Sequence, residues 1–200
     1  MEEAIVFIDG GFLSKLSKHL GNEKYISFNL INFSKRLGKK EGLFVRNAFY
    51  YTAPPFQSNP PTQEQIRRKK GYDNFVDNFK NNSFFTIKEG RVQRIINLDG
   101  KEEYNQKGVD TLIIIDLSSL PAKFPQIKTI ILVACDTDFC PIISHLQNFG
   151  VDVVLYTYYE RKRESKFSTS HHLIDSCKKV RYLKREDFDN SPINKKGDKK

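Results

Sequence analysis

An apolar run that ends abruptly in acids is the feature of this sequence that most constrains its fold. Residues 130–134 read Ile-Ile-Leu-Val-Ala, and Asp136 and Asp138 follow them closely. A short apolar run without alternating polar residues predicts a strand buried on both faces, as strands of parallel sheets are. In an open parallel α/β sheet, ligands bind just beyond the carboxyl ends of the strands. The sequence therefore predicts a parallel sheet with two carboxylates at its binding edge.

Two other segments place acids at similar boundaries. The apolar residues 5–8 are followed by Asp9, and Asp110 comes directly after the segment 107–109. Carboxylate oxygens are the ligands that hard cations such as Mg²⁺ prefer. The sequence therefore predicts one metal site built from acids of three separate segments, namely Asp9, Asp110, Asp136 and Asp138.

Each of these acids also has a purely structural interpretation. Asp9 and Asp138 precede expected helices, where aspartate is a favourable N-cap. Asp110 fits the first turn of a helix, where the helix dipole favours a carboxylate. Each interpretation works for one acid alone, but together they do not explain why the acids form an ordered set. We therefore prefer the metal-site hypothesis.

Strands alternate with helices along the chain, which predicts an α/β fold with a doubly wound, mainly parallel sheet and helices on both faces. Strands are expected at residues 4–8, 43–52, 129–134, 151–156 and 180–183, and helices at residues 12–20, 29–37, 63–80, 139–149 and 170–176. Residues 84–87 and 91–97 flank Glu89-Gly90 and resemble a hairpin, followed by a polar insertion at 99–106. Residues 108–120 fit a buried strand, but their acids and serines fit one edge of a helix better.

Length and composition favour one domain in a reducing compartment. We expect a domain at residues 1–185 and a basic, disordered tail at 186–200, because 200 residues suit one compact core. The chain has no long uninterrupted apolar window and begins Met1-Glu2-Glu3, so we expect neither a membrane span nor a secretory signal. A cytoplasmic location is expected. The three cysteines lack metal-ligand spacing and are interpreted as small buried apolar residues.

The net charge of +9 favours a polyanionic partner. Two basic clusters lie inside the expected domain, at residues 67–70 and 161–163, and the second follows three tyrosines. Cations beside aromatic rings suit single-stranded nucleic acid, whose phosphates pair with the cations while its bases stack on the rings. A solvated surface is the alternative interpretation. The predicted substrate-binding residues are Arg46, Arg67, Arg68, Lys69, Arg161 and Lys162.

The order of four motifs resembles the NYN domains of the PIN-like nuclease superfamily. The motifs lie at residues 6–13, 107–110, 135–143 and 150–156, so the resemblance covers most of the chain up to about Leu183. It implies a Rossmann-like fold, an acid cluster that binds Mg²⁺ or Mn²⁺, and cleavage of RNA. The family's metal-site positions fall on Asp9, Asp110, Asp136 and Asp138, and a further family acid falls on Asp116, for which an exposed helix edge is the alternative.

The chain departs from the family pattern at three positions. Gly11 stands where many members have Asn, which removes an amide that could contact substrate or water. Cys135 stands where Gly or Asn usually precedes the paired acids. Lys178 lies near a position where members often carry an acid.

The favoured hypothesis is a metal-dependent ribonuclease that hydrolyses RNA phosphodiester bonds with a metal-activated water. The alternative is an RNA-binding module of the same fold with weak or absent catalysis. A phosphotransferase with an acidic nucleophile fits poorly, because Gly11 stands where such enzymes commonly place a second acid. RNA is the expected partner, and a homo-oligomer is compatible with the sequence.

Overall fold

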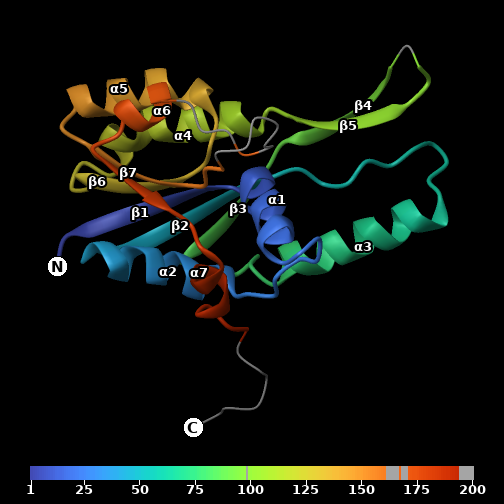
Figure 1. Cartoon of the computed structure of the whole chain (residues 1–200), viewed down its shortest axis with the longest axis horizontal. Helices are drawn as coiled ribbons and strands as arrows, with labels where there is room; N and C mark the ends of the chain where they lie inside the picture. The colour runs from blue at the N-terminus through green and yellow to red at the C-terminus, as the bar shows by residue number, and fades with distance from the viewer. Residues whose placement is uncertain (98, 161–166, 168–170, 194–200) are drawn as a thin grey trace, which may run out of the picture.

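A six-stranded parallel sheet forms the centre of the computed structural model (Figure 1), which describes residues 1–200 except 98, 161–166, 168–170 and 194–200. The strand order is β3-β2-β1-β6-β7-β8, and every neighbouring pair is parallel. This confirms the expected α/β class with a parallel sheet. The strands are β1 Glu3–Asp9, β2 Phe44–Thr52, β3 Phe85–Glu89, β6 Thr129–Val133, β7 Asp152–Thr157 and β8 Lys179–Tyr182.

Helices cover both faces of the sheet (Figure 1). Because side chains of a strand alternate between faces, Ile5 and Phe7 of β1 belong to one apolar core, and Val6 and Ile8 belong to the other. The first core includes residues of α4 Val109–Lys123, α5 Cys140–Asn148 and α6 His171–Asp175. The second includes residues of α1 Gly10–Leu20, α2 Leu30–Glu41 and α7 Arg185–Asp189. No helix in the described part of the chain is long and apolar enough to span a membrane.

The ambiguous segment 108–120 forms most of a helix, as the spacing of its acids and serines predicted. Val109, Ile113, Leu117 and Leu120 of α4 are buried at helical spacing. The exposed Ile115 on the opposite side obscured this periodicity in the sequence.

The predicted hairpin of residues 84–87 with 91–97 is wrong. β3 instead continues the main sheet beside β2, while β4 Arg91–Ile96 pairs antiparallel with β5 Glu102–Lys107. The amide of Gly90 donates to the carbonyl of Thr52 at 2.8 Å, so the chain does not turn back at this glycine. The segment expected as a polar insertion thus supplies β5. Its residues are all exposed, so no apolar pattern marked it as a strand.

The expected boundary of the disordered tail is also wrong. Residues 185–189 form α7, in which Asp187 and Phe188 are buried, and the nearby Ser191 is buried too. The ring of Phe188 lies 4.9 Å from that of Phe28 and 5.4 Å from that of Phe33. A single aromatic residue among charges therefore anchors a segment whose composition predicted disorder. Residues 194–200 of the predicted tail lie outside the described residues.

α3 Gln63–Asp77 lies within the helix expected at residues 63–80 and begins with a capping box between Thr62 and Gln65. In Figure 1, α3 and the β4–β5 hairpin extend on the same side of the domain, with the segment 53–62 running between them.

Asp116 is buried rather than exposed on a helix edge. It accepts hydrogen bonds from the Tyr51 hydroxyl at 2.6 Å and from Lys88 Nζ at 2.7 Å, and so connects α4 with β2 and β3. Burial and the neighbouring carboxylate raise the pKa of Tyr51 well above its usual range, so its hydroxyl stays a donor. These contacts give Asp116 a structural role.

We expect Asp116→Ala to lower the free energy of unfolding by about 3 kcal/mol, because it leaves a buried hydroxyl and a partly buried ammonium without their partner. Urea denaturation followed by circular dichroism measures this change. The exposed Asp77 at the end of α3 provides the matched control, since Asp77→Ala removes an acid without such partners. Equal stability of the two variants would contradict this role.

Candidate active site

Asp9 ends β1 and also caps the first helix. Its Oδ1 accepts hydrogen bonds from the amides of Gly11 at 2.8 Å and Phe12 at 3.1 Å. The capping interpretation and the site interpretation are therefore compatible, because both amides bind the same carboxylate oxygen. Gly10 permits the tight turn between strand and helix, since a Cβ at this position would lie 2.6 Å from the carbonyl oxygen of Tyr51.

The paired acids lie after β6, the neighbour of β1 in the sheet. Ile8 is in register with Val133, so the parallel strands bring Asp9 and Asp136 to the same sheet edge. Asp136 caps the short helix η1 Thr137–Phe139, and its Oδ1 accepts from the amide of Asp138 at 3.0 Å. Asp136 is partly buried, whereas Asp138 is exposed.

Asp110 approaches the same edge from a third segment. It lies in the first turn of α4, two residues after Gly108, whose φ of 80° makes the sharp entry into the helix. The side chain is half-buried.

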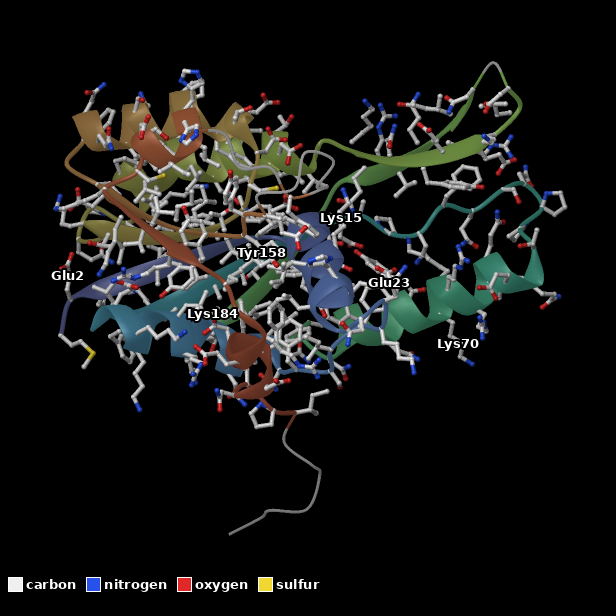
Figure 2. All side chains as sticks on the ribbon, in the orientation of Figure 1. Glu2, Lys15, Glu23, Lys70, Tyr158 and Lys184 are labelled. Atoms are coloured by element: carbon white, nitrogen blue, oxygen red, sulfur yellow. The ribbon has the colours of Figure 1, made fainter. Side chains whose placement is uncertain are left out.

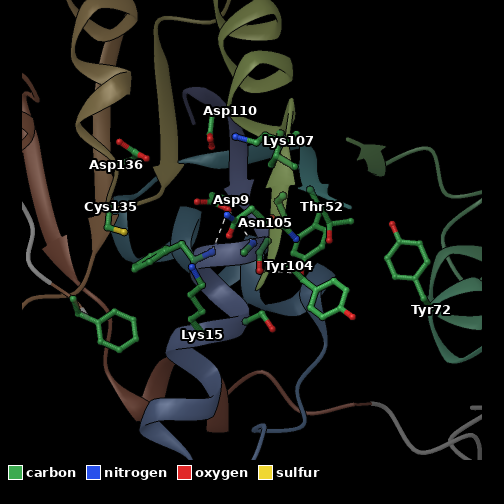
Figure 3. Close-up of a pocket in the computed structure, with 18 of the residues that line it drawn as sticks. Asp9, Lys15, Thr52, Tyr72, Tyr104, Asn105, Lys107, Asp110, Cys135 and Asp136 are labelled. Carbon is green, nitrogen blue, oxygen red and sulfur yellow. Dashed lines mark hydrogen bonds between the residues drawn. The ribbon is translucent and has the colours of Figure 1, made fainter. Parts of the chain in front are cut away.

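Asp9, Asp110 and Asp136 line one cavity of about 820 Å³. Figure 3 shows these three side chains around a common space, with Cys135 beside them and Lys15 below. Lys15 comes from α1 and Lys107 from β5. Asp138 is not among the residues that line this cavity. The fold thus brings three of the four predicted acids together at the carboxyl edge of the sheet.

The acids influence one another electrostatically. Burial raises the pKa of Asp9 to about 6, and the nearby Asp110 contributes to the rise. Burial, followed by the charges of Asp136 and Asp138, raises the pKa of Asp110 above its ordinary value. Lys15 opposes both increases. Negative charge that Lys15 offsets only in part therefore gathers at this edge, where a cation would relieve the repulsion.

Within the described residues, no three His, Cys, Asp or Glu side chains form a ready-made group that could hold a metal ion. The oxygen donors around the cavity nevertheless suit Mg²⁺ or Mn²⁺, because Mg²⁺ commonly binds one or two carboxylates and completes its shell with water and substrate phosphate. The residues fit such an ion as an open site rather than as an enclosed cage.

Sequence reasoning missed Gln106, which occupies the space beside Gly11. A Cβ at position 11 would lie only 2.8 Å from Gln106 Oε1. Gly11 therefore leaves room for an amide that arrives from β5. No sequence signal linked these two positions, because the strand that carries Gln106 was interpreted as an insertion.

The predicted substrate-binding residues that the structure describes do not line the cavity. Arg46 lies near the start of β2, at the opposite edge of the sheet from the acids, and its Nη1 donates to Glu3 Oε2 at 3.0 Å. Arg46 therefore lies away from the acid-lined cavity, and its role in substrate binding stays a prediction.

The basic cluster of α3 forms ion pairs along its own helix. Arg67 and Arg68 both pair with Glu64, and Lys69 pairs with Asp73. In Figure 2, Lys70 lies on the side of α3 that faces away from the hairpin, whereas Lys15 of α1 is labelled close to the base of the hairpin. The helix instead lines the cavity with Tyr72 and Phe75. Arg161 and Lys162 lie outside the described residues.

Two departures from the family pattern have different structural settings. Cys135 lines the cavity, and its burial, together with Asp9 and Asp136, raises the pKa of its thiol to about 11. It is therefore a thiol rather than a reactive thiolate at neutral pH. Lys178 pairs with Asp152 at the protein surface.

We expect Asp9→Asn to stabilise the metal-free protein at neutral pH. Burial raises the carboxyl pKa from 3.8 to about 6, so across this range the native state binds more protons than the unfolded state. The parent's free energy of unfolding therefore falls as the pH rises through this range. The variant, whose amide still accepts from the backbone, should be about 2 kcal/mol more stable than the parent at pH 8. Urea denaturation in EDTA at pH 4 and pH 8 measures the free energy of unfolding of both proteins. If the variant and the parent differ by the same amount at both pH values, the prediction is contradicted.

Comparisons with known proteins agree with the fold. The family model described as "NYN domain" matches residues 3–184. No curated protein matches the chain.

One similar solved structure is the crystal structure of a protein of unknown function, VPA0982, from Vibrio parahaemolyticus RIMD 2210633. It is 18% identical, covers 94% of this chain and 95% of its own, and superposes with a TM-score of 0.56. At this identity the likeness supports the fold alone. Since the family model matches residues 3–184 of this 200-residue chain, the chain belongs to the NYN domain family, which is generally a family of nucleases.

Proposed function

We propose that this protein is a metal-dependent ribonuclease that hydrolyses phosphodiester bonds of RNA. The observation that carries the proposal is the convergence of Asp9, Asp110 and Asp136 on one cavity at the carboxyl edge of the sheet. Membership of a nuclease family supports the reaction class. The net charge of +9 favours a polyanionic substrate.

The chain's own residues would orient the reactants. Backbone amides hold Oδ1 of Asp9 and Oδ1 of Asp136, which fixes the direction of both carboxylates. Burial raises the pKa of Asp9 in the metal-free protein, and a bound cation would favour its ionised form, so this carboxylate gains a neighbour of opposite charge when a cation binds. Lys15 and Lys107 bring positive charge to a cavity that would otherwise repel a phosphodiester.

A divalent cation bound by these carboxylates would supply charge stabilisation at the phosphate and would lower the pKa of a bound water. Asp9 and Asp136 are the proposed direct ligands. Asp110 and the exposed Asp138 are each proposed as a ligand or as a group that positions water.

We expect the free protein to bind Mn²⁺ weakly, because its acids form an open site, and to bind it several-fold more tightly when RNA supplies phosphate oxygens. Electron paramagnetic resonance of free Mn²⁺, recorded with and without a phosphorothioate RNA that resists cleavage, measures both affinities. By linkage, Mn²⁺ must tighten RNA binding by the same factor. Mn²⁺ binding that RNA leaves unchanged would contradict the proposed open site.

We expect the parent protein to cleave end-labelled single-stranded RNA in the presence of Mn²⁺ or Mg²⁺. EDTA should abolish this cleavage. Asp136→Asn should lower the rate at least about 100-fold, since the charge stabilisation at stake is several kcal/mol. Asp77→Asn on α3 is the matched control and should retain the parent's rate. Equal product from Asp136→Asn and the parent would discard the catalytic proposal.

The alternative is an RNA-binding module of the same fold, which the lack of a ready-made metal group among the described residues favours. RNA binding that persists in EDTA, with no cleavage in any divalent cation, would identify the module.

A further inference from the structure

The β4–β5 hairpin forms one wall of the acid-lined cavity. Tyr104, Asn105, Gln106 and Lys107 all line it, and β5 ends only three residues before Asp110. The base of the hairpin is fixed to the domain, since Val92 packs against the core. A protruding ribbon thus delivers aromatic, amide and basic groups next to the acids.

One face of this hairpin is turned towards the domain. Directly opposite residues of an antiparallel pair share a face, and the register pairs Arg94 with Tyr104 and Val92 with Gln106. All four residues therefore lie on the same face. Two contacts identify it as the inner face, since Val92 packs against the core and Gln106 lies beside Gly11 of α1.

The inner face carries an aromatic platform. The ring of Tyr104 lies 5.4 Å from that of Phe56, and the Arg94 guanidinium lies 5.5 Å from the centre of the Phe56 ring. Tyr104 remains 48% exposed, so much of its surface is available to a ligand.

Aromatic residues of α3 line another part of the same cavity. Tyr72 and Phe75 lie there with ring centres 6.4 Å apart, and the Tyr72 hydroxyl donates to Glu89 Oε1 at 2.7 Å. Aromatic side chains from two elements that are separate in sequence therefore belong to the cavity that contains the carboxylates.

We propose that the inner face of the β4–β5 hairpin binds unpaired nucleobases of single-stranded RNA, with Tyr104 as the stacking platform. This inference rests on the proposed ribonuclease function and specifies its substrate class. Aromatic stacking tolerates any base, and basic residues nearby can pair with the phosphates. The amide of Gln106, on the same face as Tyr104, offers donors and an acceptor to the edge of a base. A duplex hides its base faces inside the helix, so it cannot use this platform.

The test measures binding in EDTA, which separates recognition from cleavage. Fluorescence anisotropy compares a labelled single-stranded RNA, an abasic strand of the same length and a duplex of the same sequence. The parent should bind the single strand more tightly than either of the other two.

Tyr104→Leu should weaken binding of the single strand at least about fivefold and leave the abasic strand unchanged, because it removes only the stacking ring. Tyr104→Phe should bind as the parent does. Tyr182→Leu is the matched control, because Tyr182 is 50% exposed on β8 and does not line this cavity. Thermal unfolding of each variant verifies the fold.

A base analogue gives a direct readout of stacking. The fluorescence of 2-aminopurine in the strand should be quenched by the parent and less by Tyr104→Leu. Unchanged affinity of Tyr104→Leu, or an equal loss on the abasic strand, would overturn the proposal. Base-dependent binding through Tyr104 without any cleavage would instead defeat the ribonuclease function while leaving the hairpin's role in place.

Discussion

The parallel pairing of β1 with β6 is the constraint on which the candidate site depends. Because Ile8 lies opposite Val133, the chain leaves both strands at the same edge and places Asp9 close to Asp136. Each acid then caps the helix that follows its strand. The same backbone geometry that starts these helices therefore orients the carboxylates. Asp110 joins them from the first turn of α4, so the entire group is set by elements that the two apolar cores hold in place.

Bringing these acids together makes it less favourable for each of them to carry a negative charge. Burial and mutual repulsion raise the pKa values of Asp9 and Asp110, while Asp116, a few residues later on α4, is buried with two hydrogen-bonding partners. The contrast separates two kinds of buried acid. Asp116 has its charge and hydrogen bonds satisfied within the protein, whereas the acids at the sheet edge retain a repulsion that a bound cation would remove.

The parts of the fold that could be predicted from sequence are those with a local signature. The acids Asp9 and Asp136 follow apolar runs, so their placement at one sheet edge was evident from the strands alone. Arg46 lies away from the acids although its strand was predicted almost as observed, because a residue near the start of a parallel strand lies at the end opposite the carboxyl edge. Phe188 was overlooked because its burial depends on distant partners in α2 and its preceding loop. Gln106 could not be found, since its approach to Gly11 depends on a hairpin without an apolar pattern.

The exposure of β5 carries an evolutionary consequence. All its residues are exposed, so substitutions there cost the domain core almost nothing. Gln106 adds one mild constraint, because a Cβ at position 11 would lie 2.8 Å from its Oε1 and the flexible amide would have to move aside. Related proteins could therefore diversify the residues of the ribbon while the domain keeps its core.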